Sequence, residues 1–176
     1  MTLPTEKIFE GNYISVSKKT IRTAKGEFSR EIVEHHPAAV IIPFVYPDTV
    51  YLIKQYRHAV EETLIEVSAG CLNPNEDPLQ GALRELREET GLIAGKMTPL
   101  GEAFPAPGFC TEYLYFFLAQ DLTQGETQWD EDEEIDCFTT SLSEMGRLIK
   151  SKTIRDAKTI LSYYFLKEYL ESITPS

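Results

Sequence analysis

The stretch from Gly70 to Leu92, GCLNPNEDPLQGALRELREETGL, restricts what this chain can form more than any other part of it. Its glycines, acids, arginine and apolar residues stand at set spacings, at Gly70, Glu76, Arg84, Glu85, Leu86, Glu88, Glu89, Gly91 and Leu92. From average residue usage, the odds that seven fixed and two apolar positions match such a pattern by chance in 176 residues are on the order of 10⁻⁷. The stretch therefore indicates a defined site.

The same stretch predicts a helix. Asp77 is a good N-cap, Pro78 suits the first helical position and Gln80 stands where a capping box has Glu or Gln. Gly91 is placed to end the helix in a left-handed conformation. The expected buried stripe has helical spacing and consists of Leu79, Ala82, Leu83, Leu86 and Thr90.

Three acids of this helix, Glu85, Glu88 and Glu89, are three and four residues apart, so their carboxylates crowd one side. A Glu-rich helix face is often simply solvated, but the set spacing favours a site. Carboxylate oxygens on a rigid element suit Mg²⁺ or Mn²⁺, and Mg²⁺ commonly shares its ligands with substrate phosphates. The pattern thus indicates a metal-dependent phosphate site.

Composition limits the location and the partners. The length of 176 residues suits one domain, and the net charge of −11 opposes binding to nucleic acid. An anionic diphosphate would also be repelled unless divalent cations intervene. Three cysteines and three histidines lack ligand spacing, so we expect reduced thiols and no zinc. With no apolar run of membrane length and no signal-peptide pattern, we expect a cytoplasmic protein without membrane contact.

Hydrophobic patterning predicts strands on both sides of this helix. Alternation over 13–21 and 27–33 indicates a β-hairpin, and the apolar run 38–46 a strand buried on both faces, with Pro43 at an edge or a bulge. Further strands are expected at 50–55, 64–67, 100–104, 113–119 and 135–139. Two helices should follow, one capped by Ser141 or Ser143 and one over 155–170 with the apolar stripe Ala157, Ile160, Leu161, Tyr164 and Phe165. The expected fold class is α/β, a mixed sheet covered on both faces.

The stretch 70–92 resembles the Nudix box of hydrolases that cleave nucleoside diphosphates linked to another moiety. Other segments, in order, resemble ADP-ribose pyrophosphatases and the related GDP-mannose hydrolases: REIVEHHPAAVIIPF, QYR, LIEVSAG, FPAPGFCTEYLYFFLA, DEDEEI and IRDAKTI. The resemblance implies an α/β/α sandwich with a mixed sheet, preceded by a small N-terminal antiparallel β-sheet. We therefore assign residues 1–37 to that sheet, for dimerisation and base binding, and residues 38–176 to the Nudix hydrolase domain.

The resemblance also implies roles for single residues of the box. The carbonyl of Ala69 with Glu85 and Glu89 would hold the metal ions, and Glu88 would support them. Arg84 and Glu76 would brace the helix against the loop at Gly70. The alternative for this pair is a plain surface ion pair.

Residues outside the box receive roles in the same way. Arg57 would contact the diphosphate, the alternative being an exposed arginine at a strand end. Pro107 and Gly108 fit the loop that in these relatives distinguishes sugar-linked diphosphatases from enzymes acting on nucleoside triphosphates. Glu112 would touch the terminal ribose or a metal ion.

Water activation and base binding are assigned by resemblance too. The general base would be Glu131, with Glu133 as the fallback, and the alternative is a disordered acidic loop. Tyr13 and Arg30 would clamp the adenine, contributed by both subunits of a homodimer with a swapped N-terminal sheet. Alternatively, Tyr13 packs the hairpin and Arg30 pairs on the surface.

Together these features predict a Nudix pyrophosphatase that uses Mg²⁺, with Mn²⁺ also suitable, to hydrolyse ADP-ribose or a related nucleoside diphosphate sugar. The products would be AMP, or another nucleoside monophosphate, and a sugar phosphate. GDP-mannose or a broad range of nucleotide sugars is an alternative substrate. A non-catalytic sensor of ADP-ribose is an alternative of another class.

Overall fold

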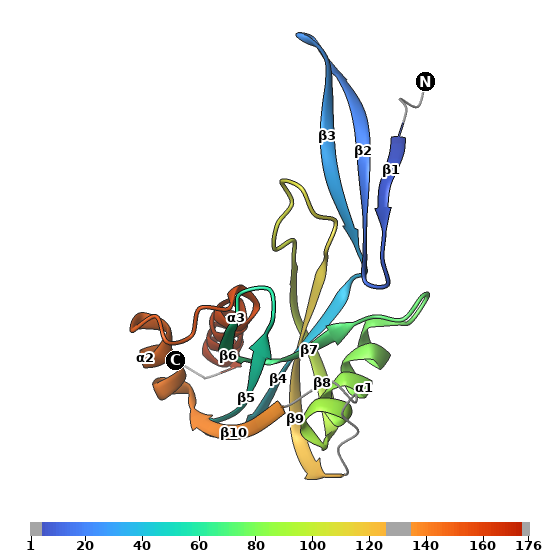
Figure 1. Cartoon of the computed structure of the whole chain (residues 1–176). Helices are drawn as coiled ribbons and strands as arrows, with labels where there is room; N and C mark the ends of the chain where they lie inside the picture. The colour runs from blue at the N-terminus through green and yellow to red at the C-terminus, as the bar shows by residue number, and fades with distance from the viewer. Residues whose placement is uncertain (1–4, 126–134, 174–176) are drawn as a thin grey trace.

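A computed structural model describes residues 5–125 and 135–173. A small three-stranded sheet projects from a larger mixed sheet that carries helices on both faces (Figure 1). The two sheets follow one another along the chain, with the first ending at His35 and the second beginning at Ala38. The expected α/β class with a small N-terminal antiparallel sheet is confirmed.

The N-terminal sheet contains β1 (Thr5–Glu10), β2 (Ile14–Thr23) and β3 (Gly26–His35), all antiparallel. The expected hairpin is β2–β3, and Gly26 at φ 126° permits its tight turn. Strand β1 was not expected, because its sequence TEKIFE carries too few apolar residues to stand out from a loop. The sheet buries little on its own, so it presents much of its apolar surface to solvent.

The larger sheet has the strand order β10-β5-β4-β9-β8, with β6 paired to β5 and β7 paired to β4. Among the strand pairs of this sheet within the described residues, β4–β9 is parallel and the others are antiparallel, which confirms the mixed sheet. Its strands are β4 (Ala38–Val45), β5 (Thr49–Arg57), β6 (Glu62–Glu66), β7 (Ser68–Cys71), β8 (Leu92–Ala103), β9 (Leu114–Gln124) and β10 (Ile135–Ser141).

Strand β4 changes partner along one of its sides. Residues 38–41 pair with β7, whereas Phe44 and Val45 pair with β5. Pro43 was expected at a sheet edge or a bulge, and it lies at neither: β4 is central, and Pro43 pairs with Ala119 of β9 without a shift in register. Pro43 is tolerated because it stands where β4 leaves β7 and has not yet reached β5, so this side requires no ladder hydrogen bond from it.

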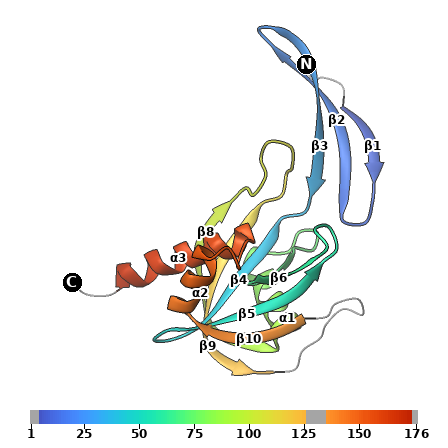
Figure 2. The same cartoon turned by 60° about the vertical axis from the view of Figure 1, so that its left-hand side comes forward.

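Helix α1 (Pro78–Thr90) covers one face of this sheet, and α2 (Leu142–Lys150) and α3 (Ala157–Ile173) cover the other (Figure 2). The expected caps of α1 are present: the Asp77 side chain accepts hydrogen bonds from the N–H groups of Leu79 and Gln80, and Gly91 has φ 69°. Ser141 is the N-cap of α2. Leu79 was expected in the buried stripe of α1 but is 37 % exposed, because it lies in the first turn beyond the edge of the core.

The buried face of α3 agrees with the expected stripe at Ile160, Leu161 and Phe165, which pack against the core, but not at Ala157 and Tyr164. Tyr164 is 58 % exposed, whereas Thr159, Ser162 and Leu166 are buried. The helix turns this side inward because the Thr159 hydroxyl accepts a hydrogen bond from the buried N–H of Val67, at 2.9 Å. Val67 joins β6 to β7 and lies in neither ladder, so its N–H needs this side-chain partner.

All three cysteines are free thiols, as expected. Within residues 5–125 and 135–173, none of the helices combines the length and the apolar character needed to span a bilayer.

Candidate active site

Two acids of α1 converge on the backbone of strand β7. Glu89 is only 4 % exposed, and its Oε2 accepts a hydrogen bond from the N–H of Ala69 at 3.1 Å. The carboxylate of Glu85 lies against Gly70 so closely that a Cβ added there would be 2.0 Å from Glu85 Cδ. Gly70 is thus required for close approach rather than for its backbone angles, and the Ala69–Gly70 segment becomes a cradle for two carboxylates.

Arg84 lies among the acids of the same helix and loop. Its Nη1 donates to Glu85 at 2.6 Å and to Glu88 at 2.9 Å, and its Nε and Nη2 both donate to Glu76 at 2.9 Å. Nη2 also donates to the carbonyl of Cys71 at 3.0 Å. These hydrogen bonds, Glu76 first, raise the pKa of Arg84. They also lower the pKa of Glu76 from 4.5 to about 2.

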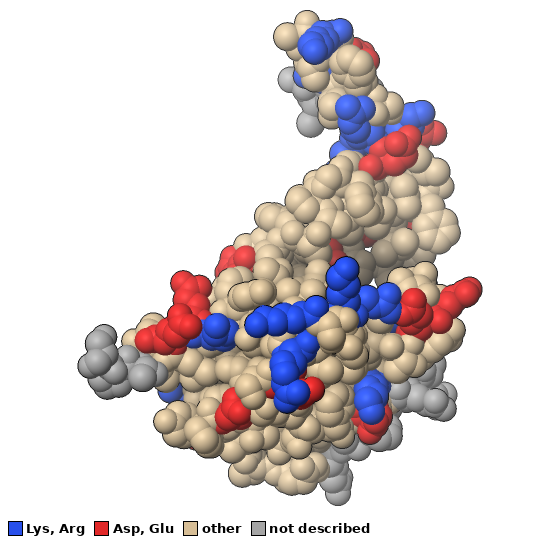
Figure 3. Space-filling model, turned by 90° about the vertical axis from the view of Figure 1, so that its left-hand side faces the viewer, with Lys and Arg blue, Asp and Glu red and all other residues tan. Residues whose placement is uncertain are grey.

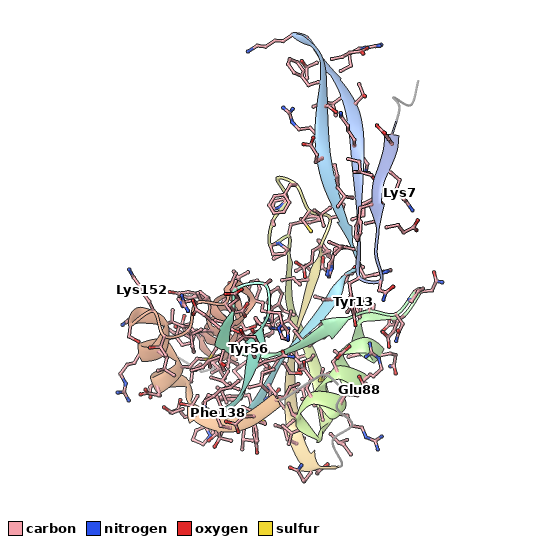
Figure 4. All side chains as sticks on the ribbon, in the orientation of Figure 1. Lys7, Tyr13, Tyr56, Glu88, Phe138 and Lys152 are labelled. Atoms are coloured by element: carbon pink, nitrogen blue, oxygen red, sulfur yellow. The ribbon has the colours of Figure 1, made fainter. Side chains whose placement is uncertain are left out.

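The oxygen donors at this place fit a divalent cation. Glu85 and Glu89 offer carboxylates, and the adjoining Ala69 offers a backbone carbonyl, which is the donor chemistry of Mg²⁺ and Mn²⁺. Over the described part of the chain, no three His, Cys, Asp or Glu side chains are gathered closely enough to hold a metal on their own. Backbone, water and phosphate oxygens would complete the ligands, as is usual for Mg²⁺. Glu88, on the more exposed side of α1, is labelled in Figure 4.

Arg57 ends β5 and forms a paired contact with Glu66 of β6. Its Nε and Nη2 donate to the two Glu66 oxygens at 2.8 and 2.7 Å. Glu66 is 1 % exposed and also contacts Lys158 of α3. Sequence reasoning missed both Glu66 and Lys158. Glu66 is a single charge inside the apolar run 64–67, which signals a buried partner, whereas Lys158 follows Arg155 and Asp156 and gives no such signal. The pKa of Arg57 is raised, chiefly by the Glu66 hydrogen bonds, and the charge of Glu89 adds to the effect.

The loop after β8 is bound to the N-terminal sheet. Pro107 and Gly108 form an exposed turn, followed by Phe109, whose carbonyl accepts from the N–H of Val33 at 2.7 Å. Thr111 donates its N–H to the Val33 carbonyl at 2.9 Å, and its hydroxyl accepts from the N–H of His35 at 3.0 Å. The predicted substrate loop is therefore held in place by β3.

Glu112 follows this loop and lies near the box acids. Its Oε1 is 3.9 Å from Nδ1 of His35, a residue to which the sequence had assigned no role. The pKa of the Cys71 thiol is raised by burial first, and then by the charges of both Glu112 and Glu85. Glu112 and Glu85 therefore both lie near Cys71.

The two residues of the predicted base clamp do not meet within one chain. Tyr13 is 73 % exposed at the foot of the N-terminal sheet (Figure 4) and lines a hollow of about 280 Å³ with Glu34, His35 and His36. Arg30 pairs with Lys19, five residues along the ladder from the Ile14–His35 pair. At ~3.4 Å per residue this is about 17 Å. A clamp made of both residues needs a second chain. Glu131 and Glu133, the predicted bases, lie outside the described residues.

The mixed sheet with helices on both faces defines an α/β domain, and its acidic helix α1 packs against the strand that contains Gly70. This chain belongs to the NUDIX domain family, whose model matches residues 34–163. The resemblance noted in the box is therefore confirmed.

Several relatives match over nearly their whole length. The chain is 35 % identical to an ADP-ribose pyrophosphatase of Bacillus subtilis (strain 168), covering 97 % of this chain and 95 % of that protein. It is also 35 % identical to a methanol dehydrogenase activator of Bacillus methanolicus, over 94 % and 91 % of the two chains. A GDP-mannose pyrophosphatase of Escherichia coli is 32 % identical over 95 % of each. The crystal structure of an ADP compounds hydrolase, 24 % identical, superposes with a TM-score of 0.85 over 98 % of this chain and 94 % of that one, which shows the shared fold.

Proposed function

We propose that this protein hydrolyses the diphosphate bond of ADP-ribose, or of a related nucleoside diphosphate sugar, to a nucleoside monophosphate and a sugar phosphate. The observation that carries the proposal is the convergence of Glu85 and Glu89 on the Ala69–Gly70 backbone. The names of two relatives, an ADP-ribose pyrophosphatase and a GDP-mannose pyrophosphatase, support a nucleotide-sugar substrate.

The protein's own residues would divide the work. Glu85, Glu89 and the Ala69 carbonyl would hold Mg²⁺, or Mn²⁺, with Glu88 in support. When bound, such an ion neutralises phosphate charge and lowers the pKa of a bound water. Since the chain carries a net charge of −11, it needs these cations to attract a diphosphate.

Groups around the carboxylates would orient the substrate. Two hydrogen bonds to Glu66 fix the orientation of the Arg57 guanidinium, which would donate hydrogen bonds to phosphate oxygens. Glu112 would contact the terminal ribose beside the loop at Pro107 and Gly108. Glu131 or Glu133 would take the proton from the attacking water.

We further propose a homodimer with a swapped N-terminal sheet, in which Tyr13 of one subunit and Arg30 of the other clamp the base. Three observations support it: the distance between these residues in one chain, the hollow beside Tyr13, and the exposed apolar residues of the sheet. The last group consists of Ile8, Phe9, Ile14, Ile21 and Phe28, each 37 to 54 % exposed. Sedimentation at micromolar concentration should show a dimer, and a monomer would rule out the shared clamp. The free thiols support a reducing compartment, the cytoplasm.

The substrate is tested by comparing ADP-ribose, GDP-mannose, ADP-glucose and NADH with Mg²⁺ or Mn²⁺. Added phosphatase releases inorganic phosphate from the monoester products. ADP-ribose should give the highest kcat/KM. A preference for GDP-mannose would make GDP-mannose the substrate, and equal rates with all the nucleotide sugars would indicate a broad specificity. In both cases the proposed reaction, hydrolysis of the diphosphate bond, would stand.

A second candidate function is regulatory. The relative named as a methanol dehydrogenase activator favours a regulatory role, in which the site would bind ADP-ribose as a sensor. The box here retains all its carboxylates, which argues against a purely non-catalytic role. Tight binding of ADP-ribose without turnover at saturating Mg²⁺ or Mn²⁺ would favour the sensor.

A further inference from the structure

A buried ionic cluster lies between β6 and the start of α3. Its centre is Glu66, which is 1 % exposed and contacts Arg57 and Lys158. Lys158 also lies 3.1 Å from Asp156, and its side chain is 15 % exposed. Arg57 belongs to the proposed substrate site, whereas Lys158 and Asp156 have no role in it so far.

A carboxylate buried to this degree needs partners, because removing a charge from water costs several kcal/mol. Burial alone would raise the pKa of Glu66, but the hydrogen bonds from Arg57 and the charge of Lys158 outweigh it, and the pKa is lowered. Glu66 is therefore an anion shared by two cations. One oxygen, Oε2, contacts both Arg57 Nη2 and Lys158 Nζ.

The cluster is tied to the proposed metal site through the chain. Glu66 precedes Ala69 by three residues, and the N–H of Val67 between them donates to Thr159 of α3. Thr159 follows Lys158 directly, and Asp156 accepts hydrogen bonds from the Thr159 N–H at 2.9 Å and hydroxyl at 2.6 Å. The first turn of α3 thus holds both Glu66 and the chain that leads to the Ala69–Gly70 cradle.

Other cations on this side of the molecule are bound differently. Figure 3 shows Lys and Arg side chains in a band across the face on which α2, α3 and β6 lie in Figure 1. Arg155, next to the cluster, contacts Glu62 with 54 % of its side chain exposed. An ion pair as exposed as this one contributes little to the stability of the fold. Lys158 differs because it contacts a buried carboxylate that Arg57 also uses.

We propose, on the basis of the proposed function, that Lys158 is a positioning residue for the diphosphate: by sharing Glu66 with Arg57, it keeps that carboxylate from neutralising the Arg57 guanidinium. Without Lys158, the full charge of Glu66 is directed at Arg57, and the local charge beside the diphosphate falls by one unit. In the proposed site, Arg57 would contact the phosphates both in the bound substrate and in the transition state. A weaker positive charge at Arg57 should therefore weaken binding of the substrate more than it slows turnover.

The test uses Lys158→Gln, which removes the charge but keeps an N–H donor for Glu66, and Lys158→Arg, which restores the charge. Lys167→Gln is the matched control on the same helix, since Lys167 is 46 % exposed and lies 3.9 Å from Glu171. Lys158→Gln should raise the KM for ADP-ribose about tenfold with kcat changed less than about twofold. Lys158→Arg and Lys167→Gln should stay within about twofold of the wild type in both constants.

A double-mutant cycle shows whether Lys158 acts through Arg57. In an Arg57→Gln background, Lys158→Gln should change KM by less than about twofold, because no charge is left at position 57 for Glu66 to neutralise. Equal changes in both backgrounds, or a KM for Lys158→Gln equal to that of Lys167→Gln, would overturn the inference while leaving the proposed function intact. A wild-type protein that turns over no ADP-ribose would overturn both. Should Lys158→Gln fail to fold, the Lys158→Arg variant decides, since a KM raised tenfold with the charge retained contradicts the account.

Discussion

Glu89 occupies a position that is costly for an acid. It is 4 % exposed, and Ala69 donates one hydrogen bond to it. Glu89→Gln can still accept that hydrogen bond, so the fold should persist, but it removes a charge that the proposed metal ion requires. Turnover should fall about 100-fold or more, as measured by initial rates at saturating Mg²⁺. Glu88→Gln, at a carboxylate that is 35 % exposed, should lose less. A near-normal rate for Glu89→Gln would remove Glu89 from the metal site.

Glu76 gives a pH-dependent test at the same scale. Its folded-state pKa is lowered from 4.5 to about 2, first by the Arg84 hydrogen bonds. The contribution of Glu76 to stability is therefore complete above 4.5 and is lost as the pH falls from there toward 2. Glu76→Gln should lower the free energy of unfolding by about 1–3 kcal/mol at pH 7.

Urea unfolding of both proteins between pH 3 and pH 7 measures this difference. It should narrow steadily below pH 4.5, where the wild type begins to lose the contribution that the variant lacks. A difference that stays constant over this range would show that the Glu76–Arg84 contact contributes nothing through charge.

The sequence predicted single residues well where they belong to the box. Ala69, Glu85 and Glu89 were expected together, and the structure brings Glu89 to the N–H of Ala69 and Glu85 to the adjoining Gly70. The partner of Arg57 could not be predicted, because the β5–β6 ladder places Glu62, not Glu66, opposite Arg57, and the contact with Glu66 is made only by the side chains. Nor could the distance between Tyr13 and Arg30 be anticipated, since it depends on the register of the hairpin.

At the scale of elements, the join between β6 and β7 depends on α3. The N–H of Val67 has the Thr159 hydroxyl as its partner at 2.9 Å, and both residues are buried. Thr159→Val keeps the shape and removes the acceptor, so it should lower the free energy of unfolding by about 1–3 kcal/mol. Thermal or urea unfolding measures this. Thr123→Val, at an exposed position of β9, is the control and should change stability by less than about 0.5 kcal/mol.

Elements were predictable where local patterns decide them. The caps of α1 at Asp77 and Gly91 lie in the sequence itself, and the helix begins and ends as expected. The position of Pro43 was wrongly predicted, because it depends on the fork at which β4 exchanges β7 for β5. Tyr164 was wrongly placed in the buried face of α3, which includes Thr159, the partner of the Val67 N–H. Local propensity does not encode a fork made by distant strands.

At the scale of the whole molecule, the net charge opposes binding of the substrate, whereas the arrangement of the sheets and cations favours it. A protein with a net charge of −11 repels a diphosphate in general, yet Arg57 is near enough to Glu89 for that charge to raise its pKa, and Lys158 shares Glu66 with Arg57. The N-terminal sheet holds the loop of Pro107 and Gly108 through β3. The proposed dimer would thus bring the base clamp and the substrate loop together around one site.

The central claim is tested most directly by turnover of ADP-ribose in ¹⁸O-labelled water, with the products identified by mass spectrometry. The account predicts equal amounts of AMP and ribose 5-phosphate, with one labelled oxygen in only one of the two products, and only when Mg²⁺ or Mn²⁺ is present. Attack of one water on one phosphorus breaks one diphosphate bond and requires this result. Intact ADP-ribose after incubation with metal and stoichiometric protein, or products cleaved outside the diphosphate, would contradict it.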